Sequence, residues 1–207
     1  MKVLLFDTET NGLPLSRKAL PSDTSKWPHV LQISWVVIEY SEAGKKTLDS
    51  ETAYLRLPVD VKWNAESAQF HKIPRSLIET APEPASILQR FVRAAKMADM
   101  IVAHNLAFDK PVIQAAFYRL DPKESFSWWP RNEFCTMEGM KDICKLPSKY
   151  PRPGDIWKRP TLTELYEFLY GSQPPSGMTL HTADGDTNLL IECFEEIVFK
   201  HLVPILR

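Results

Sequence analysis

The sequence predicts an α/β domain with a mixed central sheet, in which three antiparallel strands precede parallel strands and helices flank the faces. Two observations carry this prediction. The first third of the chain holds extended apolar segments separated by turn residues, and the middle alternates helical periodicity with short apolar runs. The length of 207 residues, with 44% hydrophobic and 25% charged residues, suits one globular domain over residues 1–207.

The antiparallel strands are expected at the start of the chain. Residues 2–7 (KVLLFD) form a short apolar run, and residues 31–40 (LQISWVVIEY) are rich in β-branched and aromatic types. A turn containing Gly44 leads into a third segment at residues 46–56. The prolines and Asn-Gly of residues 11–28 predict a loop between the first two strands.

Helices and parallel strands are expected to alternate after that. An apolar face predicts a helix that starts near Pro84, since proline suits a first helical turn. Residues 100–104 (MIVAH) predict a buried parallel strand, followed by a second amphipathic helix. The remaining expectations are a strand at 133–136, a proline-rich basic connector at 147–160, and helices at 162–170 and from 183 to about the C-terminus.

Composition excludes several classes of protein. Three cysteines without a CxxC pair argue against a disulfide framework and against a zinc site. No apolar run reaches the length of a membrane span or a signal-peptide core, so we expect an intracellular, cytoplasmic protein. The net charge is −1, yet residues 141–160 hold six cations and two aspartates, a local net of +4. This stretch is either a phosphate-contacting segment or a solvated loop.

Two carboxylates lie at the carboxyl end of the first expected strand, in the order Asp7-Thr8-Glu9. Because strand side chains alternate between faces, Asp7 and Glu9 point the same way and Thr8 points to the opposite face. Two carboxylates at this spacing can share one divalent cation. The triplet is a weak signal alone, since a chain with 26 acidic residues contains such triplets by chance.

Two further carboxylates and a histidine occupy comparable places. Asp109 follows the expected strand at 100–104, so it is either an ordinary helix N-cap or a ligand at the rim of the sheet. Asp186 lies on the apolar face of the last expected helix and points toward the sheet, where a cation would offset the cost of burying its charge. His181 precedes that helix on a loop, either as an exposed loop residue or as a group able to reach the site.

This set points to displacement chemistry at phosphorus. Two divalent cations held by the four carboxylates would activate a water and stabilise the leaving oxygen. Histidine commonly serves as a general base near neutral pH, so His181 is the candidate to accept the proton of that water.

The segments DTET, HNLAFD and HTADGD, in this order, resemble the three exonuclease motifs of the DEDDh (DnaQ-like) family over residues 3 to about 199. The resemblance implies an RNase H-like fold, two Mg²⁺ or Mn²⁺ ions, and hydrolysis from a 3′ end that releases nucleoside 5′-monophosphates. It implies metal ligation by Asp7, Glu9, Asp109 and Asp186, with His181 as the general base. It also implies a pocket for the terminal nucleotide lined by Thr8, Leu13, Phe70, His71, Asn105 and Phe108.

Finer similarities concern the substrate. Residues 169–175 (LYGSQPP), followed closely by HTADGD, are similar to TREX-type DNA exonucleases. Residues 70–73 (FHKI) instead resemble the bacterial DNA polymerase III epsilon proofreading subunits, with lysine replacing their usual glycine at 72, and the loop 16–28 is longer than in the simplest members. We therefore predict a DNA exonuclease, and the sequence does not assign it to one of these two subfamilies. The alternatives are an RNA-trimming enzyme of RNase T or oligoribonuclease type, and an inactive nucleic-acid binding module, which would have no need of His181.

The expected partner is nucleic acid, as DNA 3′ ends that are single-stranded or frayed, with RNA as the alternative. Only 21 residues follow Asp186, and we expect no polar tail for tethering to a polymerase. The expected edge strand at 46–56 could pair with a second copy, or its charges could prevent pairing, so the sequence leaves the oligomeric state open.

Overall fold

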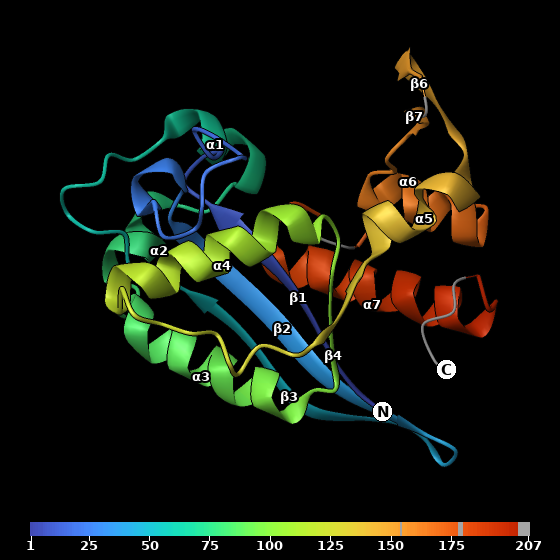
Figure 1. The fold of residues 1–207 in the computed structure, drawn as a ribbon, viewed down its shortest axis with the longest axis horizontal. Coiled ribbons are helices and arrows are strands. Elements are labelled where there is room, and N and C mark those ends of the chain that lie inside the picture. The colour runs from blue at the N-terminus through green and yellow to red at the C-terminus, as the bar shows by residue number, and fades with distance from the viewer. Residues whose placement is uncertain (154, 178–179, 203–207) are drawn as a thin grey trace.

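The computed structural model describes residues 1–153, 155–177 and 180–202, and its centre is a five-stranded sheet (Figure 1). The strand order is β3-β2-β1-β4-β5. Strands β1, β2 and β3 pair antiparallel, while β4 and β5 continue the sheet parallel to β1. The predicted mixed α/β sheet is confirmed. The strands are β1 (Lys2–Thr10), β2 (Val30–Ser41), β3 (Gly44–Tyr54), β4 (Met100–Ala103) and β5 (Asn132–Cys135).

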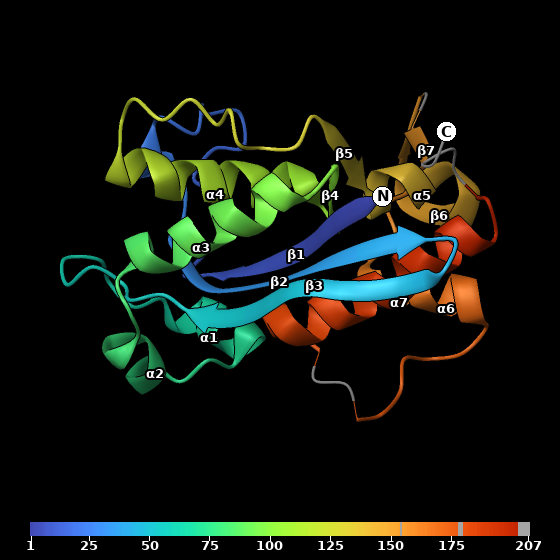
Figure 2. The same cartoon turned by 90° about the horizontal axis from the view of Figure 1, so that it is seen from below.

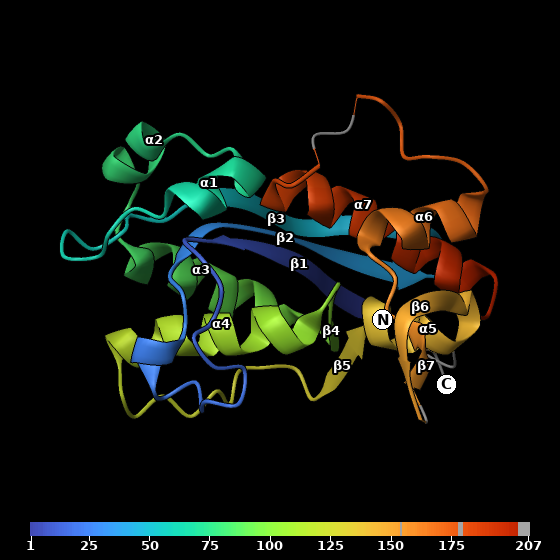
Figure 3. The same ribbon diagram turned by 90° about the horizontal axis from the view of Figure 1, so that it is seen from above.

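Helices cover both faces of this sheet (Figures 2 and 3). Helices α3 (Pro84–Met97) and α4 (Leu106–Leu120) lie on one face, and α7 (Ala183–Phe199) lies on the other. The central strand β1 is buried on both sides over residues 3–6. Its even-numbered side chains there pack in the same apolar cluster as α3 and α4, and its odd-numbered ones pack with α7.

Several expected elements have shifted ends. Strand β1 continues three residues beyond the predicted end and so includes both carboxylates of the first motif. Helix α6 (Leu162–Tyr170) has the predicted bounds, and Thr161 with Glu164 forms a reciprocal capping box at its amino end. Helix α7 ends at Phe199, short of the predicted end, and residues 203–207 lie outside the described part.

Three short helices were not predicted: α1 (Ala65–His71), α2 (Arg75–Thr80) and α5 (Thr136–Cys144). Each is too short to show a clear apolar period. Their formation depends on caps and tertiary contacts, as at α1, where the Asn64 side chain accepts the backbone N–H groups of Glu66 and Ser67. A single 3₁₀ turn, η1 (Thr24–Lys26), interrupts the expected loop at residues 11–28.

The expected connector at residues 147–160 was wrong, because this segment forms a second, two-stranded sheet. Strands β6 (Leu146–Arg152) and β7 (Asp155–Lys158) pair antiparallel, with Leu146 opposite Lys158. Figure 1 shows this hairpin extending away from α5 and α6. The sequence did not predict these strands because the segment is rich in proline, which lacks the N–H that a central strand requires.

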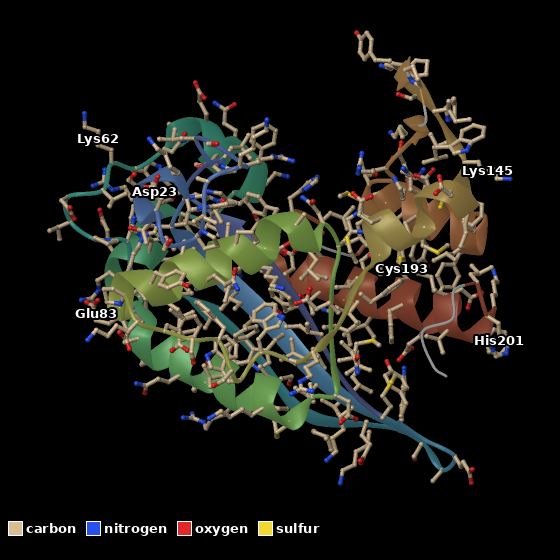
Figure 4. All side chains as sticks on the ribbon, viewed as in Figure 1. Asp23, Lys62, Glu83, Lys145, Cys193 and His201 are labelled. Atoms are coloured by element: carbon tan, nitrogen blue, oxygen red, sulfur yellow. The ribbon has the colours of Figure 1, made fainter. Side chains whose placement is uncertain are left out.

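All three cysteines are free, as their number and spacing predicted, and Cys193 lies buried in the apolar layer between α7 and α6 (Figure 4). Among the described residues, no helix combines the length and the apolar character that crossing a bilayer requires.

Candidate active site

Three carboxylates meet where β1 passes the amino end of α7. The odd-numbered face of β1 continues to Asp7 and Glu9, and Asp186 lies in the first turn of α7. Carboxylate oxygens of Asp7, Glu9 and Asp186 all lie within 4.8 Å of one another, and the three residues are half-buried. The predicted convergence of the first and last motifs therefore holds.

Hydrogen bonds to β2 fix the amino end of α7. The backbone N–H of Ala183 donates to Gln32 Oε1 at 3.0 Å, and Gln32 is the antiparallel partner of Glu9 in the sheet. One turn later, the Thr187 hydroxyl donates to the Ser34 carbonyl at 3.4 Å. The position of Asp186 is thus set by the same strand pairing that sets the position of Glu9.

Asp109 reaches the site from the other face of the sheet. It lies in the first turn of α4, is only 2% exposed, and accepts a hydrogen bond of 2.6 Å from the Thr8 hydroxyl. The N-cap interpretation of Asp109 was wrong, because α4 begins at Leu106 after Asn105, whose left-handed φ of 70° starts the helix. Pro111 consequently lies in the second turn of α4 and not in the first.

Burial and mutual repulsion raise the pKa values of all four carboxyl groups. Burial is the largest cause at each, and neighbouring carboxylates add to it. The pKa of Glu9 rises to about 8, and that of Asp109 rises to about 7 despite the opposing hydrogen bond from Thr8. Asp7, beside the other three, has a pKa well above its ordinary value.

The donor set fits divalent cations. Hard cations such as Mg²⁺ and Mn²⁺ prefer carboxylate oxygens, and a bound cation relieves the repulsion among buried like charges. Asp7, Glu9 and Asp186 are placed to hold one, with Asp109 adjoining them.

His181 lies beside Asp186 on the exposed side of the cluster. Its backbone N–H donates to Asp186 Oδ1 at 3.3 Å, and its φ is 63°, an uncommon conformation for a non-glycine residue. The positive form of its ring lowers the pKa of Asp186, although burial raises that pKa overall. The side chain itself is exposed, so the ring is attached close to the carboxylates and remains open to solvent.

A cavity of about 510 Å³ adjoins Glu9 and has mostly apolar walls. Leu13, Phe70, His71 and Phe108, four of the six residues expected in the nucleotide pocket, line it. Sequence reasoning missed the part of the wall formed by the amino end of α1, namely Asn64, Glu66 and Ser67. The one available signal was Asn64 as a helix N-cap.

The other two expected pocket residues lie elsewhere. Thr8 is buried beneath Asp109, and Asn105 occupies the turn before α4; neither is among the residues that line the cavity. Thr8 therefore positions Asp109 and does not line the cavity.

His71 contributes the one buried polar side-chain atom that lacks a partner within the described residues. Its Nδ1 accepts the backbone N–H of Ile73 at 2.9 Å, and Nε2 is buried without a hydrogen bond. Burial lowers the pKa of His71, so its ring is neutral and Nε2 carries the proton. His71 lines the cavity, and its Nε2–H is a buried donor without an acceptor among the described residues.

The sheet, its flanking helices and the carboxylate cluster define a nuclease domain of the DnaQ-like, RNase H-like class. The family model described as "Exonuclease" matches residues 4–194, and the chain belongs to this exonuclease family. No curated protein sequence matches the chain.

Solved structures show the same fold. The zinc-bound complex of E. coli exonuclease I with single-stranded DNA matches with a TM-score of 0.70 and 17% identity, over 97% of this chain and 41% of that one. The same enzyme with a dT13 oligonucleotide matches with a TM-score of 0.68 and 15% identity, over 97% of this chain and 43% of that one. Exonuclease X with 5′-overhanging duplex DNA matches with a TM-score of 0.57 and 15% identity, over 96% of this chain and 93% of that one. The chain therefore spans less than half the length of the exonuclease I structures and nearly all of exonuclease X.

Proposed function

We propose that this protein is a metal-dependent 3′→5′ exonuclease that removes nucleotides from DNA ends as nucleoside 5′-monophosphates. One observation carries the proposal: Glu9 belongs both to the carboxylate cluster and to the wall of the apolar cavity. A terminal nucleotide held in that cavity would present its phosphodiester to the cluster.

The roles of the carboxylates follow from their charge and placement. Bound divalent cations would supply activation of the attacking water and stabilisation of the leaving oxygen. Asp7, Glu9 and Asp186 would hold them, and Asp109, fixed by Thr8, would complete the ligand set. We propose two cations, Mg²⁺ or Mn²⁺, because four carboxylates exceed what one cation needs for charge neutralisation.

His181 is the proposed general base. Its exposed ring is adjacent to Asp186 and could accept the proton of the water that attacks phosphorus. The cavity residues would orient the terminal nucleotide: Phe70 and Phe108 offer aromatic faces, and Nε2 of His71 offers a hydrogen-bond donor.

DNA is the proposed polymer. The structural neighbour exonuclease I is solved with single-stranded DNA, and exonuclease X is solved with 5′-overhanging duplex DNA. RNA trimming is the second candidate, because the cavity is open enough to admit a terminal nucleotide with a 2′-hydroxyl.

The test is a digestion panel with single-stranded DNA, mismatched duplex DNA and RNA of one sequence. A 3′-labelled strand should release its label at once as a mononucleotide, and a 5′-labelled strand should give a ladder of shortening products. Rapid cutting of circular single strands would contradict an exonuclease. Faster digestion of RNA than of DNA would reassign the substrate without changing the chemistry.

A further inference from the structure

The β6–β7 hairpin is fixed at its root to helices α5 and α6. Lys158 forms an ion pair with Glu164 of α6 at 2.6 Å, and Arg159 pairs with Glu138 of α5. These two cations of the basic stretch therefore stabilise the root. They are less available to phosphates than the sequence suggested.

His104 connects this root to the carboxyl end of β4, next to the start of α4. The residue follows β4 directly, and its ring lies between Pro160 and Thr136, with Nε2 3.1 Å from the Pro160 carbonyl and Nδ1 2.9 Å from the Thr136 hydroxyl. Since the carbonyl can only accept, Nε2 donates to Pro160 and Nδ1 accepts from Thr136. The end of the hairpin is thus hydrogen-bonded to the turn that starts α4 and positions Asp109.

The outer part of the hairpin is exposed and carries an aromatic ring beside a cation. Tyr150 is 85% exposed and Ile156 is 52% exposed, so both side chains are open to a binding partner. Lys149 is exposed and has no ion pair within the described residues. Residues 145–152 include three cations and no carboxylate. The prolines at 147, 151 and 153 restrict the backbone, so little entropy is lost when the segment binds.

We propose that the β6–β7 hairpin is an arm that binds the single-stranded part of the substrate leading into the site, with Tyr150 stacked on a base and Lys149 beside a phosphate. The proposal rests on the proposed function and adds a second contact with nucleic acid, outside the cavity. An exposed aromatic ring beside an exposed lysine matches the sequence-independent binding of single strands, in which bases stack and phosphates are neutralised. The fixed root holds this contact at a constant place relative to the carboxylates.

The test compares a thymidine dinucleotide with a long oligothymidylate, because only the long strand extends from the cavity to the arm. Tyr150→Ala should raise KM for the long strand by about fivefold to a hundredfold, the usual effect of losing one base–aromatic stack. Its kcat, and both constants for the dinucleotide, should stay as in the wild type. Tyr150→Phe should retain the wild-type KM and Tyr150→Leu should not, since stacking requires a π-face and not merely apolar surface.

Two matched controls are available. Lys145 lies on the outer side of the hairpin root in Figure 4, so Lys145→Ala should change KM much less than Lys149→Ala. Phe199 is 79% exposed at the far end of α7, and Phe199→Ala should have no effect on either substrate. Equal effects of Lys145→Ala and Lys149→Ala would show diffuse attraction and overturn the specific arm.

Binding of the labelled long strand in EDTA separates this proposal from the proposed function. If the wild-type protein cleaves and binds the long strand, and Tyr150→Ala does both equally well, the proposed arm is wrong and the proposed function stands. Protein that cleaves nothing would refute the proposed function, and weaker binding by Tyr150→Ala would then still support the arm.

Discussion

The Thr8 hydroxyl donates a 2.6 Å hydrogen bond to Asp109 Oδ1 and so joins β1 to α4 across the face of the sheet opposite to α7. The four carboxylates are therefore divided by the sheet. Asp7, Glu9 and Asp186 gather on the α7 side, and Asp109 approaches from the α4 side. Thr8 acts as the positioning residue for the fourth carboxylate.

Replacing Thr8 with valine should impair metal binding at the carboxylates and leave the walls of the cavity unchanged. The hydrogen bond from Thr8 lowers the pKa of Asp109 against the effect of burial, so its loss should raise that pKa further above about 7. The variant should need more Mg²⁺ for half-maximal activity and should reach full activity only at higher pH. Thr8→Ser should behave like the wild type, because serine keeps the hydroxyl. An unchanged metal requirement in Thr8→Val would show that the hydrogen bond does not position Asp109.

Neutralising Asp7 should stabilise the metal-free protein while abolishing activity. Asp7 is half-buried beside three carboxylates, and asparagine removes its charge with little change of shape. The melting temperature in EDTA should rise, by about 2–4 °C per kcal/mol gained in a chain of this size. Glu42→Gln, at an exposed acidic residue, should change neither property. Full turnover by Asp7→Asn, or by the wild type in excess EDTA, would refute a metal site here.

The metal-free protein should lose stability as the pH rises above 6.5. The pKa of Glu9 is raised from 4.5 to about 8 and that of Asp109 from 3.8 to about 7, so the folded state binds these protons more tightly than the unfolded state. Their contribution is full below the unfolded pKa values and is lost as the pH rises through the folded ones. Urea denaturation in EDTA should show a lower free energy of unfolding one pH unit above the pKa of Glu9 than at pH 6.5.

Two half-buried histidines act in the opposite sense and in a different pH range. Burial lowers the pKa values of His29 and His104 from 6.5 to about 4, so their contribution is present above pH 6.5 and is lost as the pH falls toward 4. They do not titrate in the range where the carboxylates lose their protons. Saturating Mg²⁺ should therefore remove the loss above pH 6.5 and leave the acid side unchanged. If the free energy of unfolding still falls above pH 6.5 in saturating Mg²⁺, groups other than these carboxylates cause the loss.

His181→Ala should lose about a hundred- to ten-thousand-fold in kcat, the range of a general base. The fold and metal binding should be retained, because the side chain is exposed and only the backbone N–H contacts Asp186. Added imidazole should restore part of the rate. His201→Ala, an exposed histidine after α7, is the matched control and should be fully active. Activity of His181→Ala within a few-fold of the wild type would leave His181 as a loop residue.

Phe70→Ala should raise KM for both long and short substrates, since Phe70 lines the cavity while 71% exposed and offers a face to a terminal base. Loss of one stack is worth about fivefold to a hundredfold. Phe70→Trp should retain most of the affinity. Leu20→Ala is the comparison, because Leu20 is 72% exposed but does not line the cavity. Equal effects of the two alanine variants would exclude a specific role for Phe70.

The sequence by itself determined the sheet and the carboxylate set. The alternation of side chains along β1 already placed Asp7 and Glu9 on one face, and the apolar face of α7 already directed Asp186 toward the sheet. These are local properties, since the periods of strand and helix fix side-chain direction without reference to the rest of the chain.

Tertiary structure alone decided the start of α4, the helix at the cavity wall and the hairpin. Asp109 taken alone favoured a helix N-cap. In the structure α4 begins earlier, after the left-handed Asn105, and the hydroxyl of the buried Thr8 donates to Asp109. Helix α1 and the β6–β7 hairpin are too short or too proline-rich for periodicity to show. Their positions depend on contacts between residues distant in sequence, such as His104 with Pro160, and no local pattern encodes such contacts.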